Sequence, residues 1–294
     1  MNGREHAEVF SGQRRYLFAV AYRMLGVAED AEDVLQDAWL RFSRVPLTDI
    51  GSPRAFLVQV VTRLSVDLLK SARRRREEYV GTWLPEPIST DEARVDELAA
   101  RTESVSFAFL LLLERLTPVQ RAVLVLHDVL DYTHDEVASM VGTTAAASRQ
   151  ALRRARRALG ARRPATTTPS AVTRDLIAQF LEATRDGNLD GLLDTLAPDV
   201  VLMSDGGGKA ASINRPLAGS TPVARFFKAA GGENQTAVAV LGELNGQPAV
   251  LVTEQGRLTN AFLFDTGPQG LTGIYVVRNP DKLRRLGASH RTDA

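Results

Sequence analysis

The chain has 294 residues, with 36 basic and 35 acidic side chains that give a formal net charge of +1. This length is enough for about two domains that each bury a core. The chain contains no cysteine, which excludes disulfides and thiolate metal sites, and its four histidines lack any metal-ligand spacing. The first residues lack the apolar stretch of a signal peptide, and the longest apolar run, residues 107–113, is too short to span a bilayer. We therefore expect a cytoplasmic protein that contacts no membrane and holds no metal.

The charge is distributed unevenly along the chain. Residues 70–76 (KSARRRR) and 149–163 are basic, whereas residues 77–103 are mostly acidic. Two separate basic clusters indicate two contacts with nucleic acid rather than one diffuse field.

The first basic cluster ends a segment, residues 5–80, that is helical in pattern. Residues 28–42 place apolar side chains on one helical face and polar ones on the other, as in a surface helix of a small bundle. Periodicity alone predicts that this polar face is solvated. A second helix begins near Pro53 and runs into four arginines at residues 73–76. Cations suit a helix C-terminus, but four in succession exceed what the helix dipole requires and favour a phosphate partner.

Residues 116–160 predict three helices with a tight turn between the last two. Apolar residues recur at helical spacing as far as Leu130, and a short helix follows over residues 134–141. Gly142 can adopt the positive φ that ends this helix, and Thr143 or Thr144 can cap the next one. The last helix carries five arginines and no acidic residue among them. This pattern predicts a helix-turn-helix whose second helix binds the DNA major groove, and the alternative is a solvated basic helix at a domain end.

A Pro/Thr/Ser-rich linker over residues 161–170 precedes a change of pattern. Residues 171–196 predict two amphipathic helices, the segment before the glycines at 206–208 predicts a strand, and further strand-like runs lie at 236–241, 248–253, 261–264 and 273–277. Helices followed by several strands predict an α+β domain with a curved antiparallel sheet. No histidine occurs between residues 135 and 289, and Asp205, before three glycines, is better explained as a turn residue than as a catalytic acid. We therefore expect a regulatory domain without a catalytic residue or a cofactor.

Over residues 8–160 the order, spacing and length of these elements resemble regions 2 and 4 of an extracytoplasmic-function (ECF) sigma factor, group IV of the sigma-70 family. The resemblance rests on AEDAEDVLQDAWLRF, on RAFL…TRLSVDLLKSARRRR and on residues 116–160. Arg63 departs from the family pattern, because many members carry asparagine near this position to capture a flipped base of the −10 promoter element.

The resemblance implies three sets of contact residues. RNA polymerase core, through the clamp helices of its β′ subunit, would bind Asp30, Asp33, Gln36, Asp37 and Arg41. The −10 promoter element would bind Arg63, Asp67, Lys70, Arg73, Arg74, Arg75 and Arg76. The −35 element would bind one helical face that consists of Arg149, Gln150, Arg153 and Arg154. The polymerase β flap is the further expected partner.

Three short motifs resemble those of the ECF subgroup that carries a fused C-terminal SnoaL-like (NTF2-like) domain: WLPEP at residues 83–87, DGGGK at 205–209 and NPDKL at 279–283. The resemblance implies that this domain packs against the sigma core in place of a separate anti-sigma factor. It also implies that the cone of the domain can hold a small ligand, which nothing in the sequence identifies. The implied regulatory contacts are Trp83, Pro85, Glu86, Asp205, Gly206, Gly207, Gly208, Lys209, Asn279, Pro280, Asp281, Lys282 and Leu283.

Together these patterns predict a multi-domain chain of two all-α domains followed by an α+β cone. The expected parts are region 2 (5–80), a linker with WLPEP (81–104), region 4 with the helix-turn-helix (105–163), a second linker (164–170), the SnoaL-like domain (171–277) and a tail with NPDKL (278–294). The implied function is that of an alternative bacterial sigma factor, which directs RNA polymerase core to specific promoters and is regulated in cis. The alternatives are a dimeric helix-turn-helix repressor or activator with a ligand-sensing domain, which leaves residues 8–80 unexplained, and a fusion enzyme.

Overall fold

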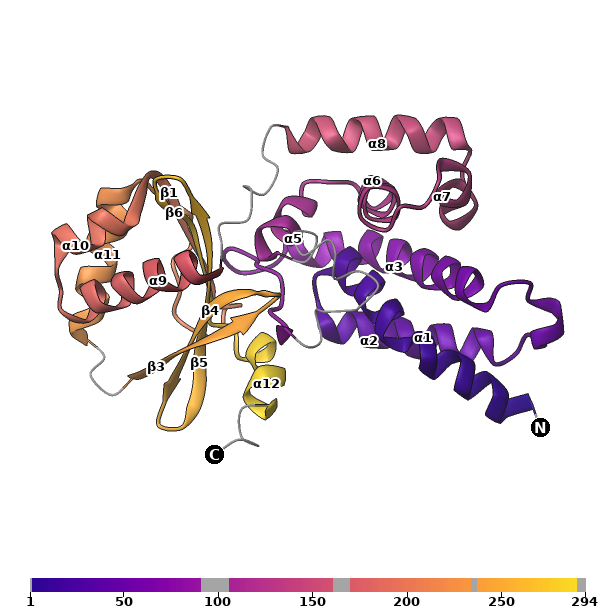
Figure 1. Ribbon diagram of the computed structural model, residues 1–294, viewed down its shortest axis with the longest axis horizontal. Coiled ribbons are helices and arrows are strands. Elements are labelled where there is room, and N and C mark those ends of the chain that lie inside the picture. Colours follow the sequence, from indigo (N-terminus) through magenta and orange to yellow (C-terminus); the bar gives the residue numbers. More distant parts are fainter. Residues whose placement is uncertain (1, 91–105, 161–169, 234–236, 290–294) are drawn as a thin grey trace. The chain divides into compact units, whose positions relative to one another are not determined.

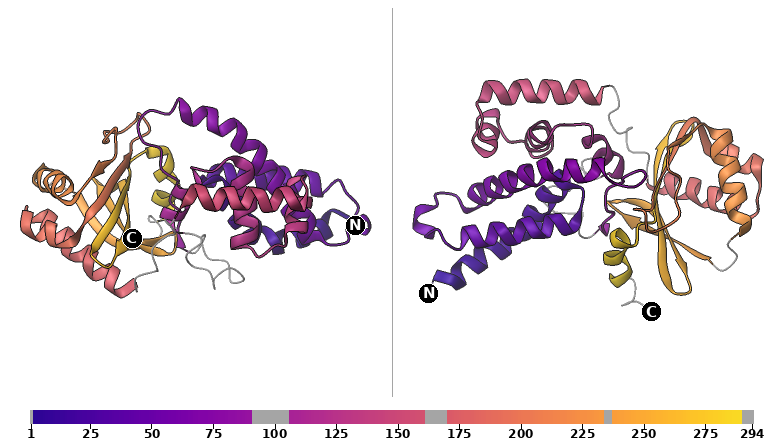
Figure 2. Two further views of the ribbon diagram at one scale, coloured as in Figure 1. Left: turned by 90° about the horizontal axis from the view of Figure 1, so that it is seen from above. Right: turned by 180° about the vertical axis from the view of Figure 1, so that it is seen from behind.

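The computed structural model describes residues 2–90, 106–160, 170–233 and 237–289 (Figures 1 and 2). These residues fall into two compact units. The helical unit comprises residues 2–77 and 109–160, and the C-terminal unit comprises residues 78–90, 106–108, 170–233 and 237–289.

The first half of the helical unit is a bundle of three helices in which each helix contacts the other two. Its elements are α1 (Asn2–Leu25), α2 (Ala28–Phe42), the 3-10 turn η1 (Leu47–Asp49) and α3 (Pro53–Glu77). The apolar face predicted for α2 is buried, and it includes Val34, Leu35 and Phe42. Trp39 is partly buried against Phe10, with the two rings edge to face and 5.3 Å apart. Aromatic and aliphatic burial of this kind stabilises a small bundle by about 1.5–3 kcal/mol for each large side chain.

The second half of the helical unit contains the predicted helix-turn-helix. Its elements are α5 (Phe107–Leu113, of which the first two residues belong to the C-terminal unit), α6 (Pro118–Leu124), the π-helical turn η3 (Val125–Val129), α7 (His134–Val141) and α8 (Ala145–Leu159). Thr133 and Glu136 form a capping box at the start of α7, and Gly142 ends that helix with a φ of 77°. Thr144 caps α8, because its hydroxyl oxygen accepts a hydrogen bond from the Ala147 N–H at 3.2 Å. The turn therefore uses Gly142 as predicted, and Thr144 rather than Thr143 as the cap.

The C-terminal unit combines helices with one six-stranded sheet. Its elements are α9 (Ser170–Arg185), α10 (Leu189–Thr195), β1 (Leu196–Asp205), β2 (Leu217–Ala218), α11 (Ser220–Glu233), β3 (Ala237–Leu244), β4 (Gln247–Glu254), β5 (Arg257–Gly267), β6 (Gly270–Val277) and α12 (Pro280–Ser289). The strand order is β2-β1-β6-β5-β4-β3. The α+β class is confirmed, but the expectation of a purely antiparallel sheet is wrong, because β1 and β6 run parallel, with Asp205 opposite Val277. Periodicity shows that a segment is a strand, but it does not show which strand becomes its neighbour.

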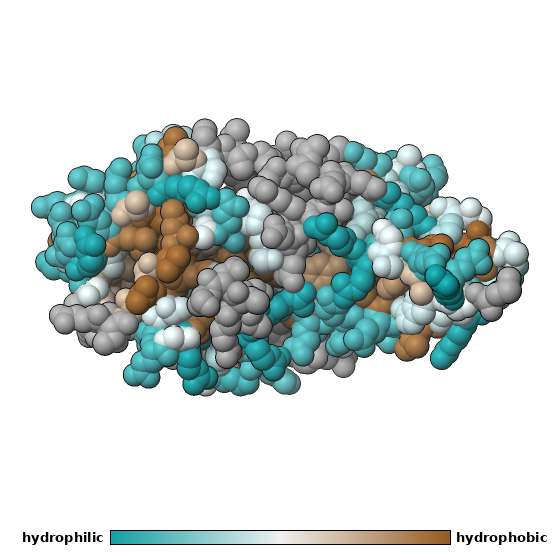
Figure 3. Space-filling model, turned by 60° about the horizontal axis from the view of Figure 1, so that its bottom comes forward, coloured by the Kyte–Doolittle hydropathy of each residue, from teal (hydrophilic) through white to brown (hydrophobic). Residues whose placement is uncertain are grey.

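The two faces of this sheet are covered differently. Figure 1 shows α9, α10 and α11 on one face and α12 on the other. The first face carries the main core, in which Phe180 packs edge to face on Phe227 at a ring distance of 4.8 Å and lies 6.1 Å from Phe264. On the other face α12 packs on β5. β3 forms an edge of the sheet, and its Val238, at 58% exposure, contributes to the hydrophobic surface of the C-terminal unit, some of which Figure 3 shows.

The structure also reassigns segments that were expected to be linker or tail. The expected strands and the two helices before them are present, whereas α11 and the two-residue strand β2 were not predicted. The helix α11 contains a proline and two glycines, which weaken its helical pattern. Residues 81–90, expected as linker, and 280–289, expected as tail, are parts of the C-terminal unit. Residues 91–104 of the first linker, 164–169 of the second and 290–294 of the tail lie outside the described residues.

Candidate functional site

The second helix of the helix-turn-helix, α8, presents a cationic face to solvent. Its buried side is formed by Ser148, Leu152 and Ala155. The four residues expected to contact the −35 element are all exposed: Arg149, Gln150, Arg153 and Arg154. An α8 that is anchored on one side and cationic on the other has the geometry that major-groove binding requires.

Two side-chain contacts fix α8 to the elements before it. His134 Nδ1 lies 2.9 Å from the Ser148 hydroxyl oxygen, and its ring stacks on His127 at 4.1 Å. Burial, the neighbouring His127 ring and nearby arginines hold the pKa of His134 below its ordinary value. Near the other end of α8, Arg156 donates two hydrogen bonds, of 2.7 and 3.0 Å, to the Asp128 carboxylate. Arg156 therefore positions α8 within the helical unit.

The residues expected to bind polymerase lie on the outer face of α2. Asp33, Gln36, Asp37 and Arg41 are exposed, and Asp30 is partly exposed. Their positions agree with the amphipathic pattern, because the opposite face of α2 is buried in the bundle.

The residues expected to contact the −10 element lie along α3. Arg63, Asp67 and Lys70 are exposed, and Lys70 forms an ion pair with Asp67 at 2.8 Å. Arg63 also donates hydrogen bonds to two backbone carbonyls at the end of α7, at 3.1 Å from Nε and 3.0 Å from Nη2. α3 continues through residues 73–76, but the side chains of Arg73, Arg74, Arg75 and Arg76 lie outside the described residues.

Asp205 is the centre of a buried polar cluster in the C-terminal unit. It ends β1 and is fully buried. Its carboxylate accepts hydrogen bonds from Lys282 Nζ at 2.6 Å, from the Tyr79 hydroxyl at 2.6 Å and from the Leu84 N–H at 3.0 Å. The interpretation of Asp205 as a turn residue is therefore wrong, because its carboxylate binds segments far from it in the sequence. The cluster joins DGGGK and NPDKL to WLPEP and to Tyr79.

Lys282 is held in this cluster on several sides. It is 8% exposed, and its ammonium also donates a hydrogen bond to the Leu84 carbonyl. The ammonium lies 4.4 Å from the ring centroid of Trp83 and 5.1 Å from that of Tyr79. A carboxylate, a carbonyl and two aromatic faces together compensate the loss of water around a buried cation.

Two glycines of DGGGK permit this close packing. Gly207 has a φ of +59°, and a Cβ at this position would lie 2.3 Å from Asn279 Nδ2 and 2.9 Å from the Tyr79 hydroxyl. A Cβ on Gly206 would lie 2.1 Å from the Ala210 carbonyl oxygen. Asn279 Nδ2 in turn donates a hydrogen bond to the Tyr79 hydroxyl at 2.8 Å. The motif is therefore glycine-rich because other groups occupy the space of the missing side chains.

The remaining predicted regulatory residues lie beside this cluster. Lys209 and Asp281 form an exposed ion pair at 2.5 Å. Gly208 and Pro280 are exposed, whereas Pro85, Glu86 and Leu283 are buried. Sequence reasoning missed Tyr79, because a tyrosine outside the three motifs has no pattern that indicates its partner.

Two further contacts hold the chain on either side of residues 91–105. The Ile88 N–H donates to Asn245 Oδ1 at 3.1 Å, and the Asn245 N–H donates to the Ile88 carbonyl at 3.0 Å. After residue 105, the Phe107 N–H donates to Gln247 Oε1 at 3.3 Å, and the Phe107 ring lies 5.5 Å from that of Tyr275. The C-terminal unit therefore binds the chain both before and after residues 91–105.

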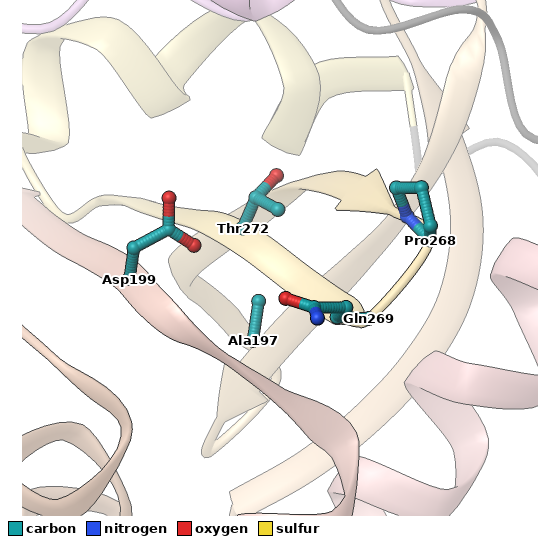
Figure 4. Close-up of a pocket in the computed structure, with 5 residues that line it drawn as sticks. All are labelled: Ala197, Asp199, Pro268, Gln269 and Thr272. Carbon is teal, nitrogen blue, oxygen red and sulfur yellow. The ribbon is translucent and has the colours of Figure 1, made fainter.

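The resemblance placed a small ligand inside the C-terminal unit, whose main core cluster is apolar. This cluster is formed by side chains that include Phe180, Phe227 and Phe264. A separate open pocket of about 380 Å³ lies where the register of β1 shifts, and Figure 4 shows Asp199, Gln269 and Thr272 among the residues that line it. Asp199 is the one titratable side chain among the residues that line this pocket, so the pocket does not contain an acid–base pair for catalysis.

A helix-turn-helix with an exposed cationic second helix, joined to a three-helix bundle with an acidic face, defines a DNA-binding transcription protein. Two family profiles match the helical part of the chain: Sigma-70 region 2 over residues 10–75 and Sigma-70, region 4 over residues 106–159. The chain is 40% identical over 291 residues to the ECF RNA polymerase sigma factor SigJ of Mycobacterium tuberculosis, which covers 93% of this chain and 91% of SigJ. It is 32% identical over 277 residues to the probable ECF RNA polymerase sigma factor SigI of the same species, covering 94% of this chain and 93% of SigI.

The fold agrees with that of SigJ over almost the whole chain. The crystal structure of Mycobacterium tuberculosis SigJ aligns with a TM-score of 0.75 and 34% sequence identity, and covers 95% of this chain and 98% of that chain. This chain therefore belongs to the ECF RNA polymerase sigma factor family.

The family resemblance deduced from the sequence is thus confirmed. A sigma factor is a transcription initiation factor whose partners are RNA polymerase core and promoter DNA, and it is not an enzyme. The alternatives of a dimeric repressor and of a fusion enzyme are excluded by the match to both sigma regions. Among the described helices, none has the length and apolarity to cross a membrane, and the same residues contain no cluster of three metal-ligating side chains.

Proposed function

We propose that the C-terminal unit regulates this sigma factor in cis by holding the linker between regions 2 and 4, in place of a separate anti-sigma factor. The observation that supports this proposal is the buried contact of Asp205 and Lys282 with Leu84 of the WLPEP motif. Burying two charges costs desolvation free energy that can exceed their mutual attraction. Stability alone therefore does not explain the buried pair of Asp205 and Lys282, and this favours a regulatory role for it. DGGGK, through Asp205, and NPDKL, through Lys282, therefore both contact WLPEP at Leu84.

A held linker changes promoter binding through effective concentration. Region 2 and region 4 bind two DNA elements, and once one region is bound, the linker sets the local concentration of the other. A linker bound at Leu84, Ile88 and Phe107 has less free length between the two regions. The C-terminal unit therefore restrains the sigma core until its hold on the linker is released.

The promoter and polymerase contacts that we propose follow the three exposed surfaces of the helical unit. The acidic face of α2 binds the β′ clamp helices, the exposed side of α3 binds the −10 element, and the groove face of α8 binds the −35 element, while region 4 also contacts the β flap. The exposure of Asp33, Asp37, Arg149 and Arg153 supports these assignments. The protein acts in the cytoplasm, where core polymerase and promoter DNA are found, and it needs no cofactor for this role.

Run-off transcription with purified core polymerase tests the regulatory role. The Lys282→Met variant removes the cation that binds both Asp205 and the Leu84 carbonyl, and we expect it to give more transcript than the wild type at a temperature where both are folded. The Lys209→Met variant, which breaks only the exposed pair with Asp281, is the matched control and should transcribe like the wild type. Equal output from a folded Lys282→Met protein would contradict regulation through the linker.

A further inference from the structure

Two histidines stack beside the start of the helix α8. The rings of His127, in the π-helical turn η3, and His134, the first residue of α7, lie 4.1 Å apart with their planes inclined by 18°. His127 Nδ1 donates a hydrogen bond to the Tyr132 carbonyl at 2.7 Å, because a carbonyl oxygen only accepts. His134 Nδ1 lies 2.9 Å from the hydroxyl oxygen of Ser148, which is fully buried on α8. The stack therefore links η3, α7 and α8, and Figure 1 shows α7 beside one end of α8.

The surroundings of His134 favour a neutral ring. Burial disfavours a charge on it, and so do the neighbouring His127 ring and two cations of α8, Arg149 and Arg156. Its place at the N-terminus of α7 adds the positive end of the helix dipole. Asp128 acts in the opposite direction, but its carboxylate already accepts two hydrogen bonds from Arg156. The result is a pKa of His134 below the ordinary value of 6.5.

The charged groups that α7, α3 and α6 place near the stack are exposed or bonded to other groups. On α7, Asp135 is exposed, and the Glu136 carboxylate accepts hydrogen bonds from the N–H and the hydroxyl of Thr133. Arg63 of α3 donates to carbonyls at the far end of α7, and the buried Arg121 of α6 donates to groups outside α7. The charges that act on the stack therefore come from α8 and η3.

We propose that the two histidines form a proton-sensitive clamp that positions α8 on the −35 element. When His134 is neutral, its Nδ1 can accept a hydrogen bond from Ser148 while its ring stacks on His127, so the start of α8 is held. Protonation leaves Nδ1 unable to accept this bond and places a cation against His127 and the arginines. The hold on α8 is then weaker, and binding to the −35 element falls with the pH. This clamp rests on the proposed role of α8 in binding that element.

The direction of the pH effect follows from the lowered pKa of His134. A histidine whose pKa is lower in the folded protein than in the unfolded chain binds its proton more weakly when folded. The contribution of His134 to the hold on α8 is therefore complete above pH 6.5 and is lost as the pH falls from that value through the lowered pKa.

The pH profile of promoter binding by the full-length holoenzyme tests the clamp. His134→Asn is the main variant, because an asparagine amide can still bond to Ser148 but does not titrate. From about pH 7.5 to about pH 5.5, we expect the wild type to lose affinity for a duplex with a −35 element, severalfold more than His134→Asn does. His6→Gln is the matched control: its amide can keep the contact with the Val45 carbonyl, and its profile should follow the wild type.

Two outcomes of this experiment would overturn the clamp. Equal pH profiles of the wild type and His134→Asn would show that protonation of His134 does not control α8. Tighter wild-type binding at the lower pH would show that the imidazolium contacts DNA phosphate instead. A proton NMR titration of the wild-type protein needs no variant: the ring protons of His134 should titrate with a midpoint below 6.5, and a midpoint at or above that value would also overturn the clamp.

Two further measurements separate the clamp from the −35 assignment. The hydrogen-exchange protection factor of the Ser148 amide, which donates to the Thr144 carbonyl at 2.8 Å, reports on the start of α8 without DNA. Promoter binding by Arg153→Ala reports on the −35 assignment alone. Acid loss of Ser148 protection in the wild type but not in His134→Asn, with normal binding by Arg153→Ala, supports the clamp and contradicts the assignment. Unchanged protection with weak binding by Arg153→Ala overturns the clamp and leaves the assignment standing.

Discussion

Lys282 and Asp205 show how one buried ion pair joins three sequence motifs. Both side chains are almost fully buried, and their attraction offsets the loss of water only because hydrogen bonds and aromatic faces complete the surroundings. Removing one partner leaves the other as an uncompensated buried charge. A single substitution in this pair therefore has a large electrostatic consequence.

We predict that Lys282→Met lowers the free energy of unfolding of the protein by about 3–5 kcal/mol, because Asp205 is left buried and charged. The exposed pair between Lys209 and Asp281 has nearly the same separation but is solvated, so Lys209→Met should change that free energy by at most about 1 kcal/mol. Urea denaturation followed by circular dichroism measures both. Similar losses in the two variants would contradict the importance of burial.

Gly207 tests the close packing around Asn279. We predict that Gly207→Ala destabilises the protein by about 1–3 kcal/mol, because its φ of +59° is strained for alanine and the new Cβ would contact Asn279 Nδ2. Gly12, which lies in α1 with open space around it, is the control, and Gly12→Ala should stabilise by about 0.5–1 kcal/mol. In thermal unfolding, the midpoint temperature should fall for Gly207→Ala and rise for Gly12→Ala; a rise for both would contradict the close packing around Gly207.

At the scale of single elements, α8 is anchored on one side and exposed on the face that we propose to meet DNA. Its N-terminal half is fixed through Ser148 and His134, and its C-terminal half through Arg156 and Asp128. Arg156 is exposed too, but its guanidinium is hydrogen-bonded to the Asp128 carboxylate, so we assign it the role of positioning the helix.

We predict that Arg153→Ala reduces discrimination at one base pair of the −35 element by about 1–3 kcal/mol, since a groove arginine reads a base edge. Arg156→Ala should instead weaken binding to all −35 sequences alike, because it loosens α8 without removing a base contact. Competition binding of the holoenzyme to a set of −35 variants distinguishes the two outcomes. Loss of base preference in Arg156→Ala would contradict its positioning role.

The neighbouring strands β5 and β6 contain a carboxyl group that responds to pH. Burial raises the pKa of Asp265 to about 6 from an ordinary value of 3.8, although the Tyr275 hydroxyl donates a hydrogen bond to it at 2.6 Å. A raised pKa means that the folded protein favours the protonated form. The contribution of this group to stability is therefore complete below pH 3.8 and is lost as the pH rises to about 6.

We predict that Asp265→Asn removes this part of the pH dependence. Relative to wild type, the variant should gain stability between pH 4 and pH 6, by up to about 3 kcal/mol, and keep a constant difference above that range. The free energy of unfolding in urea, measured at each pH, tests the prediction. Parallel curves for the two proteins would contradict the assignment of the titration to Asp265.

For the molecule as a whole, the main consequence of the structure is that the linker segment before residue 91 belongs to the C-terminal unit. Buried Leu84 and Ile88 both donate their N–H groups to side chains of that unit. We predict slow hydrogen exchange at these two amides. In Asp205→Ala the protection of Leu84 should fall by more than that of Ile88, which binds Asn245 instead. Equal and fast exchange at both amides of the wild-type protein would show that the linker is not held.

Much of the element content was predictable because it depends on local patterns. The buried face of α2, the turn at Gly142 and the strands of the sheet follow from periodicity and from the φ values that glycine allows. The exposure of Arg149, Arg153 and Arg154 on α8 was also predictable, because a helical face made of cations is not buried in a hydrophobic core. The helix α11 was missed, since local glycines weakened its signal.

The sequence by itself determined most of the elements, the cationic and acidic faces and the family, because these depend on residues close together in the chain. Only the tertiary structure decided that β1 runs parallel to β6, that Asp205 binds Lys282 and Leu84, and that Arg63 caps α7. Each of these contacts joins residues more than 70 positions apart. Such pairings are fixed by the burial of whole faces and by the need of buried polar groups for partners, and neither leaves a pattern in the local sequence.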